Sequence, residues 1–328
     1  MPRIDVLGIG NALVDVLSHE TDEFVQRMGL NRGAMTLVDE ERAHELYSAM
    51  GPGVEISGGS AANTIVGLAS FGAKAAYLGK VKDDQLGEVF AHDIRSTGVL
   101  FDCRMANDGA STGRCLIVVT PDAQRTMNTY LGASAFLGPE DVDPDLVAAA
   151  RVVYLEGYLW DRPEAKEAYR KAARIAHEAG NEVSLTLSDS FCVERHRPEW
   201  LKLVEEEVDL LFANEAEIQA LYETDFDSAL QQVRRHCRVA ALTRSAHGSV
   251  IVAGDEVHVV PAHPVEHLVD TTGAGDLYAS GFLFGYTRGA DLATCARLGS
   301  LAASEVISHL GARPETSLAE LAKALLPA

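Results

Sequence analysis

The sequence predicts an α/β protein with a doubly wound, mostly parallel β-sheet and a second, smaller β-sheet. Three observations lead to this prediction. After Pro144, short apolar runs alternate with helical patterns, which is typical of parallel strands connected through helices. From Phe101 to Tyr130 this alternation is replaced by a hairpin pattern. The chain has 328 residues, enough for one large domain with a sizeable core.

Composition limits the class of protein and its partners. Hydrophobic residues make up 47% and charged residues 23%, as in ordinary soluble globular proteins. The net charge of −20 argues against a nucleic-acid-binding surface. No run resembles a signal peptide or a membrane span, and the five scattered cysteines indicate reduced thiols. We therefore expect a cytoplasmic protein, monomeric or homodimeric, that binds a small molecule and neither nucleic acid nor a membrane.

The first predicted strand runs from Ile4 to Gly10 and ends in a glycine turn. A dinucleotide-binding fingerprint would need a third glycine at Leu13, and no helix follows at once. The turn instead delivers Asn11 and Asp15 just past a strand end, where α/β sheets place ligand-binding groups. Asp15 has apolar neighbours, which favours the polar face of a half-buried strand over an exposed turn.

A glycine pair, Gly58 and Gly59, precedes a predicted helix of small residues, with Ser60 as its expected N-cap. Such a pair is a candidate hinge, or a place where a ligand approaches the main chain. Asn63 lies one turn into this apolar helix and is expected either to bind a ligand or to bond a nearby backbone carbonyl. Further elements are expected at a strand from Met35 to Val38, a helix from Asp39, a strand from Lys74 to Leu78 and a helix near Glu88 to Ser96.

The hairpin pattern comprises strands from Thr112 to Val119 and from Arg125 to Tyr130. With the Met35 strand it is expected to form the small sheet, which has the character of a lid. Arg125 at the hairpin base is either an exposed strand arginine or a group that reaches an anion when the lid closes.

The second half of the chain supplies the remaining predicted elements. Strands are expected at Arg151–Glu156, Glu182–Leu187, Val208–Phe212, Val239–Thr243, Val250–Val252 and Val257–Val259, and helices at Glu164–Glu178, around Trp200–Val204, and at Asn214–Tyr222, Ser228–His236, Leu292–Ser308 and Leu318–Leu325.

The stretch from Asp270 to Asp276 carries the clearest chemical signal. A loop of small residues opens directly into a buried helix, so it presents free main-chain N–H groups and a positive helix end to an anion. Gly273 and Gly275 leave room for a phosphate. A carboxylate in this turn, Asp276, is out of place if the loop only binds phosphate, because the two negative charges repel each other. Its presence makes sense if it takes a proton from a hydroxyl that attacks the phosphate. The alternative is that Asp276 only caps the helix.

Asn214 and Glu217 lie one turn apart at a helix start and face the same way. An amide and a carboxylate so placed suit magnesium-bound waters, because magnesium keeps several of its waters. Helix capping with an exposed acid is the alternative.

Two motifs resemble the signatures of the ribokinase-like (PfkB) carbohydrate kinases: Gly58–Asn63 through Gly87, and Asp270–Asp276. Asn214-x-x-Glu217 matches the family's magnesium and phosphate motif. The resemblance implies one kinase domain over residues 1–328, whose lid is formed by insertions at about 12–55 and 100–135. It also implies ATP-dependent phosphoryl transfer to a sugar hydroxymethyl group.

The resemblance further implies roles for individual residues. Asp276 is the expected base, and the N–H groups of the anion loop stabilise the transferred phosphate; these loop residues are Gly273, Ala274 and Gly275. Magnesium is expected at Asn214 and Glu217 through water, and ATP also near Thr243, Gly248 and Thr272. K⁺ is a further expected cofactor, near Asp270.

Within the family the chain is most similar to the adenosine kinase branch. Asn11 and Asp15 match residues that hold the ribose in that branch. Phe191 matches an aromatic residue that packs on the base, and Arg125 matches a lid arginine near the phosphate. Gly58, Gly59 and Asn63 are the other expected substrate-binding residues. This predicts phosphorylation of a nucleoside 5′ hydroxyl, adenosine giving AMP. The alternatives are a kinase of a free sugar such as ribose or fructose, a non-catalytic nucleotide or sugar sensor, and an NAD-dependent oxidoreductase.

Overall fold

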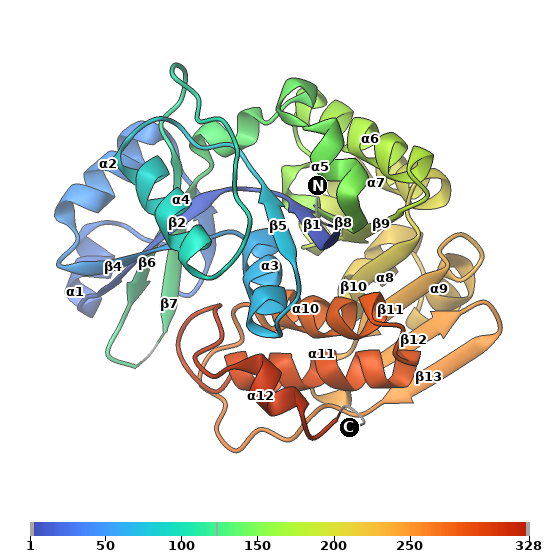
Figure 1. Ribbon diagram of the computed structural model, residues 1–328. Helices are drawn as coiled ribbons and strands as arrows, with labels where there is room; N and C mark the ends of the chain where they lie inside the picture. Colours follow the sequence, from blue (N-terminus) through green and yellow to red (C-terminus); the bar gives the residue numbers. More distant parts are fainter. Residues whose placement is uncertain (1–2, 123, 326–328) are drawn as a thin grey trace.

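The larger of two sheets is mostly parallel, as the sequence predicts. The computed structural model describes residues 3–122 and 124–325. The eight-stranded sheet has the order β13-β12-β11-β10-β9-β8-β1-β5 (Figure 1). Its strands are β1 (Ile4–Ile9), β5 (Ala75–Leu78), β8 (Ala150–Glu156), β9 (Glu182–Thr186), β10 (Leu210–Asn214), β11 (Val239–Thr243), β12 (Ser249–Ala253) and β13 (Glu256–Val260).

Strand direction places the ligand edge of this sheet. From β5 through β11 all neighbours pair in parallel, whereas β12 and β13 form an antiparallel hairpin at one side. The carboxyl ends of the parallel strands therefore meet at one edge, where open α/β sheets bind their ligands.

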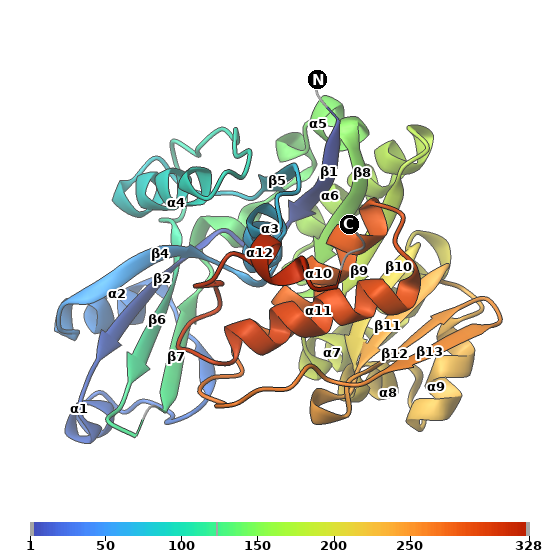
Figure 2. The same ribbon diagram turned by 60° about the horizontal axis from the view of Figure 1, so that its bottom comes forward.

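Helices cover both faces of the large sheet, because successive strand residues face opposite sides and both sets are apolar. Val6 and Val152 pack into one core cluster, while Leu7 and Val153 pack into the other. Residues of the first cluster come from α3 (Ser60–Ser70), α4 (Gln85–Ser96), α10 (Ala274–Thr287), α11 (Leu292–Val306) and α12 (Leu318–Ala322). Those of the second come from α5 (Pro144–Ala149), α6 (Pro163–Glu178), α7 (Ser190–Glu206), α8 (Glu215–Tyr222) and α9 (Phe226–Val233). Figure 2 shows α10 and α11 lying side by side over the sheet.

The small sheet has the order β3-β7-β6-β2-β4 and stands beside β1 and β5 (Figures 1 and 2). Its strands are β2 (Leu13–His19), β3 (Met35–Leu37), β4 (Gly53–Gly58), β6 (Gly113–Val119) and β7 (Arg125–Tyr130), accompanied by α1 (Asp22–Arg27) and α2 (Glu40–Ala49). Residues 10–12 join it to β1, and Gly59 joins it to α3. The two sheets are thus linked where the large sheet exposes its carboxyl edge.

The start of α3 differs from the prediction, because Gly59 and not Ser60 is the N-cap. Gly59 has φ +100°, and a β carbon there would overlap the carbonyl oxygen of Asn11. Only glycine fits this close approach between the β1–β2 connection and the start of α3. Ser60 is consequently the first helical residue, and its hydroxyl does not cap the helix.

In the described ranges 3–122 and 124–325, no helix combines the length and the apolar character needed to cross a membrane.

Close contact between α10 and α11 depends on glycine. A β carbon on Gly281 would overlap the main chain of Leu298, and one on Gly299 would lie 2.6 Å from the carbonyl oxygen of Tyr278. Main-chain atoms at such a contact cannot rotate away as a side chain can. The position of the Asp276 turn, at the start of α10, therefore depends on these two glycines.

We expect Gly281→Ala to lower the free energy of unfolding by about 1–3 kcal/mol, the usual effect of overfilling a packed site. The sign is informative, because alanine in a helix without a clash stabilises by about 0.5–1 kcal/mol. Urea denaturation measures the change, with Glu167→Ala on the exposed face of α6 as the control. A more stable Gly281→Ala variant would contradict the described packing.

Candidate active site

Polar side chains from both sheets converge at the carboxyl edge of the large sheet. Asn11 follows β1, and Glu156 ends β8. The N-termini of α3 and α10 meet them there, carrying Ser60 and Asp276. Hydrogen bonds between these elements, described below, join segments more than 200 residues apart.

Asp276 is held by two donors from α3. The Ser60 hydroxyl donates to one carboxylate oxygen at 2.6 Å, and the Asn63 side-chain amide donates to the other at 3.0 Å. Burial raises the pKa of Asp276 to about 6, while these two bonds and the Arg313 charge oppose the rise. A carboxylate with this pKa is ionised at neutral pH, so it can accept a proton.

The loop before Asp276 has the shape expected for an anion site. Gly273 has φ +79° and is the N-cap of α10. The Ala274 N–H bonds to the carbonyl of Thr271 at 3.2 Å, so it closes the turn. Within the described residues, the N–H groups of Gly273, Gly275 and Asp276 have no main-chain partner. A β carbon at Gly275 would meet no atom within 4 Å, so this side of the loop is open.

Asp270 anchors the loop and contacts the small sheet. Its carboxylate accepts from the N–H and hydroxyl of Thr272 at 3.1 and 2.7 Å, and from the N–H of Gly311 at 3.2 Å. It also pairs with Arg125 of β7 at 2.7 Å, and both side chains are at least nine-tenths buried. Two guanidinium nitrogens of Arg125, Nε and Nη2, have no partner within the described residues. Arg125 is therefore not an exposed strand arginine, and it has donors to spare beside the anion loop.

Asp15 on β2 is uncommitted, in contrast to Asp270. Burial raises the pKa of its carboxyl group to about 6, with Arg313 and Arg125 opposing and Asp276 adding to the rise. No hydrogen-bond donor contributes to this pKa. Gly58 pairs with Leu13, which lies two residues before Asp15 on β2, and a β carbon on Gly58 would overlap the Asp15 carboxyl group. The glycine at position 58 thus makes space for a carboxylate that is free to bind a ligand.

Asn11 is bound within the protein. Its side-chain amide donates to Glu156 Oε1 at 2.7 Å, and its Oδ1 accepts from Ser134 at 2.9 Å. The other Glu156 oxygen accepts from the Ala61 N–H at the start of α3, at 2.8 Å. Burial raises the pKa of Glu156 to about 7. Glu156 thereby joins the β1–β2 turn to α3, the helix whose Ser60 and Asn63 donate to Asp276.

Asn63 does not bond a backbone carbonyl, the alternative expected for it. Its amide nitrogen donates to Asp276, and its oxygen accepts from Arg313 Nε at 2.9 Å. Its side chain therefore lies between the two charged groups, and both of its polar atoms are used.

Asn214 and Glu217 form a reciprocal capping box at the start of α8. The Asn214 side chain accepts from the Glu217 N–H at 2.9 Å, and Glu217 accepts from the N–H and amide of Asn214 at 2.9 and 2.6 Å. Capping was the alternative, but the acid is buried rather than exposed. Burial raises the pKa of Glu217 to about 7. A buried carboxylate without a cation suits magnesium bound through water, and the described residues contain no cluster of three or more His, Cys, Asp or Glu that could hold a metal.

Three predicted residues stand apart from this network of bonds. Phe191, in the first turn of α7, is 73% exposed, so its ring is free to stack. Thr243 ends β11 at the carboxyl edge. Gly248 has φ +83°, and a β carbon there would overlap the carbonyl of Val260, so it is required by the turn.

Sequence reasoning assigned no role to Glu156, Ser134 or Arg313 and assigned Ser60 the wrong one. A glutamate that ends a buried apolar strand at the carboxyl edge is a usable signal, and it could have identified Glu156. Arg313 lies in an irregular segment, and nothing local to its sequence distinguishes it from an exposed arginine.

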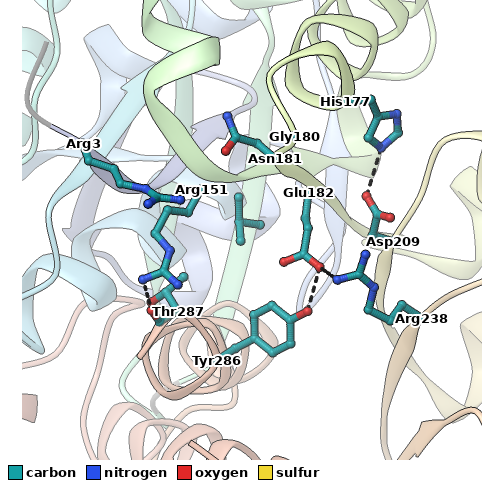
Figure 3. A pocket seen from close by; sticks show the side chains of 11 residues that line it. Arg3, Arg151, His177, Gly180, Asn181, Glu182, Asp209, Arg238, Tyr286 and Thr287 are labelled. Carbon is teal, nitrogen blue, oxygen red and sulfur yellow. Dashed lines mark hydrogen bonds and ion pairs between the residues drawn. The ribbon is translucent and has the colours of Figure 1, made fainter. Parts of the chain in front are cut away.

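A hollow of about 540 Å³ lies at the opposite, amino edge of the large sheet (Figure 3). Its charged side chains largely pair with one another: Glu182 accepts from Tyr286 and pairs with Arg238, and Asp209 bonds His177 at 2.9 Å. It contains none of the predicted site residues, so the carboxyl edge remains the candidate site.

We expect Asp15→Asn to raise the melting temperature of the ligand-free protein at pH 8. The raised pKa means that the folded state holds the Asp15 proton to a higher pH than the unfolded chain does. Folding therefore becomes less favourable between pH 3.8 and about 6, and the full cost remains above that window. Asparagine removes this cost, so the gain should be largest at pH 8 and vanish near pH 4. A variant less stable than the parent at both pH values would show that the carboxylate stabilises the fold.

Comparison with known proteins identifies the family of the chain. Residues 11–318 match the pfkB family carbohydrate kinase model. The chain is similar to the crystal structure of an adenosine kinase from Sinorhizobium meliloti, with 55% identity, a TM-score of 0.91 and coverage of 99% of this chain and 100% of that one.

The chain is also similar to two other kinases. The crystal structure of a probable sugar kinase protein from Rhizobium etli CFN 42 is 53% identical, with a TM-score of 0.91 and coverage of 99% of this chain and 100% of that one. An adenosine kinase of Saccharomyces cerevisiae is 28% identical over 92% of this chain and 94% of its own length. The chain belongs to the pfkB family of carbohydrate kinases.

Proposed function

We propose that the chain is an ATP-dependent kinase that phosphorylates the 5′ hydroxyl of adenosine to give AMP. The observation that carries the proposal is a partly buried carboxylate, Asp276, in the first turn of a helix whose free N–H groups suit a phosphate. The 55% identical structure is an adenosine kinase, which supports the choice of acceptor.

Asp276 accepts the proton of the acceptor hydroxyl as its oxygen attacks the γ-phosphorus. A bond forms between the hydroxyl oxygen and the γ-phosphorus, the bond between the γ-phosphorus and the β,γ-bridging oxygen breaks, and ADP leaves. General-base help of this kind contributes about 10²–10⁴-fold. The N–H groups of Gly273 and Gly275 stabilise the charge on the transferred group, while Ala274 holds the turn through its bond to Thr271.

Asp15 binds the sugar hydroxyls, because its carboxylate is partly buried and has no hydrogen-bond donor among the described residues. Hydrogen bonds to hydroxyls stabilise such a group and reject analogues that lack them. Gly58 and Gly59 shape this side of the pocket, and Asn11 and Asn63 support it through Glu156 and Asp276. Phe191, 73% exposed, packs on the base.

ATP lies along the carboxyl edge, with Thr243, Gly248 and Thr272 near its path. Magnesium, held through water by Asn214 and Glu217, neutralises phosphate charge when it is bound. K⁺ beside the anion loop is the remaining part of this proposal. The Asp270 side chain is already engaged by Arg125, Thr272 and Gly311, so main-chain carbonyls are the ligands available to K⁺.

The small sheet closes over the site as a lid, with Gly58 and Gly59 at its hinge. The Arg125–Asp270 pair supports this role, because it joins the lid hairpin to the anion loop. Arg125 then offers its unused donors to the phosphate. Closure excludes water, which would otherwise compete with the hydroxyl as acceptor.

A free sugar is the second candidate acceptor. The 53% identical Rhizobium etli protein is a probable sugar kinase, and a 25% identical relative from Clostridium perfringens is a 5-dehydro-2-deoxygluconokinase. Both acceptors use the same Asp276 chemistry. The two acceptors differ in one respect: adenosine has a base on which Phe191 can stack, and a free sugar has none.

We expect Asp276→Asn to lower kcat by about 10²–10⁴-fold with nearly unchanged ATP affinity, because the amide cannot take a proton. Initial rates of ADP release measure kcat, and ATP titration of the protein measures affinity. Asp291→Asn, at the N-cap of α11, is the matched control. If Asp276→Asn kept most of its turnover, Asp276 would not be the base.

Phe191→Ala distinguishes the two acceptors. ADP release is measured with adenosine, inosine, guanosine, cytidine, ribose and fructose. We expect turnover with adenosine, and a KM for adenosine raised about 10-fold by the loss of one stacking contact of roughly 1.5 kcal/mol. Val259→Ala, also 73% exposed, is the control.

Turnover with a free sugar and none with nucleosides would assign the second candidate. Silence of the parent protein across the whole panel would contradict both and leave the sensor interpretation.

A further inference from the structure

We infer that Arg313 is a positioning residue that orients the base Asp276 and ties this orientation to the small sheet. Arg313 lies in the segment between α11 and α12, far in sequence from the small sheet and from α3. The inference rests on the proposed function, since it assigns Asp276 the role of base.

The guanidinium of Arg313 bridges two elements. Its Nε donates to Asn63 Oδ1 on α3 at 2.9 Å. Its Nη2 donates to the carbonyl and, at 3.0 Å, to the hydroxyl of Ser57 near the end of β4. In the part of the chain that the structure describes, no carboxylate forms an ion pair with Arg313. Its contacts are therefore directed at neutral groups, which suits a residue that fixes geometry.

The bond to Asn63 decides which way its amide faces. A guanidinium has donors only, so the Asn63 atom beside Nε must be the oxygen. The NH₂ group then faces Asp276 and donates to Oδ2 at 3.0 Å. Without Arg313, only the Asp276 carboxylate, which accepts but cannot donate, favours this orientation, so the amide is held from one side instead of two. Whenever the amide turns over, Asp276 faces an oxygen and loses one of its two donors.

The bond to Ser57 connects this arrangement to the lid. The N–H and hydroxyl of Ser57 donate to Asp93 of α4 at 2.8 and 2.6 Å, so the hydroxyl oxygen is free to accept from Arg313. Ser57 pairs with Val14 in the small sheet and precedes Gly58, which packs on Asp15. A movement of β4 would therefore pull on Arg313 and, through Asn63, on Asp276.

The charge of Arg313 acts in the same direction as its hydrogen bonds. It opposes the burial that raises the pKa values of Asp15 and Asp276. Among the described residues, the other titratable or charged groups around the two carboxylates and Arg313 are Tyr77 on β5, Asp93 on α4, Arg125 on β7, Cys115 on β6, Tyr154 and Glu156 on β8, and Tyr158 just after β8.

The test is the pH dependence of kcat in Arg313→Gln. Loss of the positive charge should move the acid limb of the profile up by about one pH unit, the low end of the effect of an opposite charge within about 4–6 Å. Arg313→Lys keeps the charge and loses the fork, so it should restore the limb but only part of the plateau rate. Arg297→Gln, on α11 and bonded to Thr294, is the matched control. An unmoved acid limb in Arg313→Gln would overturn the electrostatic part of the inference.

A double-mutant cycle isolates the route through Asn63. Above the acid limb, at about pH 8.5, adding Arg313→Gln to Asn63→Ala should cost no further kcat, because the amide to be oriented is gone. Additive losses would overturn the positioning role.

A titration that needs no turnover separates this inference from the proposed function. Nuclear magnetic resonance of ¹³C-labelled aspartate in the ligand-free protein should show higher pKa values for Asp15 and Asp276 in Arg313→Gln than in the parent. Unchanged values would contradict the inference even if the parent phosphorylated none of the acceptors, a result that by itself would contradict only the proposed function.

Discussion

The contact between the N-termini of α3 and α10 is the interaction on which the rest of the site depends. Ser60 and Asn63 donate to Asp276, and these three residues come from opposite ends of the chain. Gly67 permits the close packing of α3 on α10, because a β carbon there would overlap Ser280, and Gly59 lets the start of α3 lie against the main chain of Asn11. Once the two helix ends are joined, the anion loop, the Asp276 carboxylate and the end of β4 lie around one space. That arrangement is the physical basis for assigning phosphoryl transfer to the site.

Burial of acids is the cost of this arrangement. Asp15, Glu156, Glu217 and Asp276 are all carboxyl groups whose pKa values burial raises to about 6 or 7. Three of them accept hydrogen bonds within the protein: Glu156 from Asn11 and Ala61, Glu217 within its capping box, and Asp276 from Ser60 and Asn63. Among the described residues, Asp15 has no such partner. This difference supports the proposal that Asp15 binds substrate hydroxyls, which would supply the donors that the fold does not.

Much of the fold follows from local sequence, and part of the site does not. Alternating apolar runs and helical patterns predict the parallel sheet because each element carries its own periodicity. The Asp270–Asp276 loop is recognisable for the same reason, since its glycines, its helix and its carboxylate are contiguous. The interactions of Asn63 with Arg313 and of Asn11 with Glu156 join residues 250 and 145 positions apart. Such bonds depend on the packed fold, so a single sequence contains no local sign of them. Ser60 illustrates the same limit: a serine before a helix predicts a cap, yet tertiary contact with Asp276 determines its role.

The position of the phosphate in the product tests whether the 5′ hydroxyl of adenosine is the group that the protein phosphorylates. The protein is incubated with ATP, magnesium and adenosine, and the product is examined by phosphorus nuclear magnetic resonance with proton coupling. Transfer to the 5′ hydroxyl gives a phosphomonoester coupled to the two 5′ methylene protons, as in AMP. A phosphate coupled to a single ribose proton, as in a 2′ or 3′ ester, or ADP release without a phosphorylated nucleoside, would contradict it.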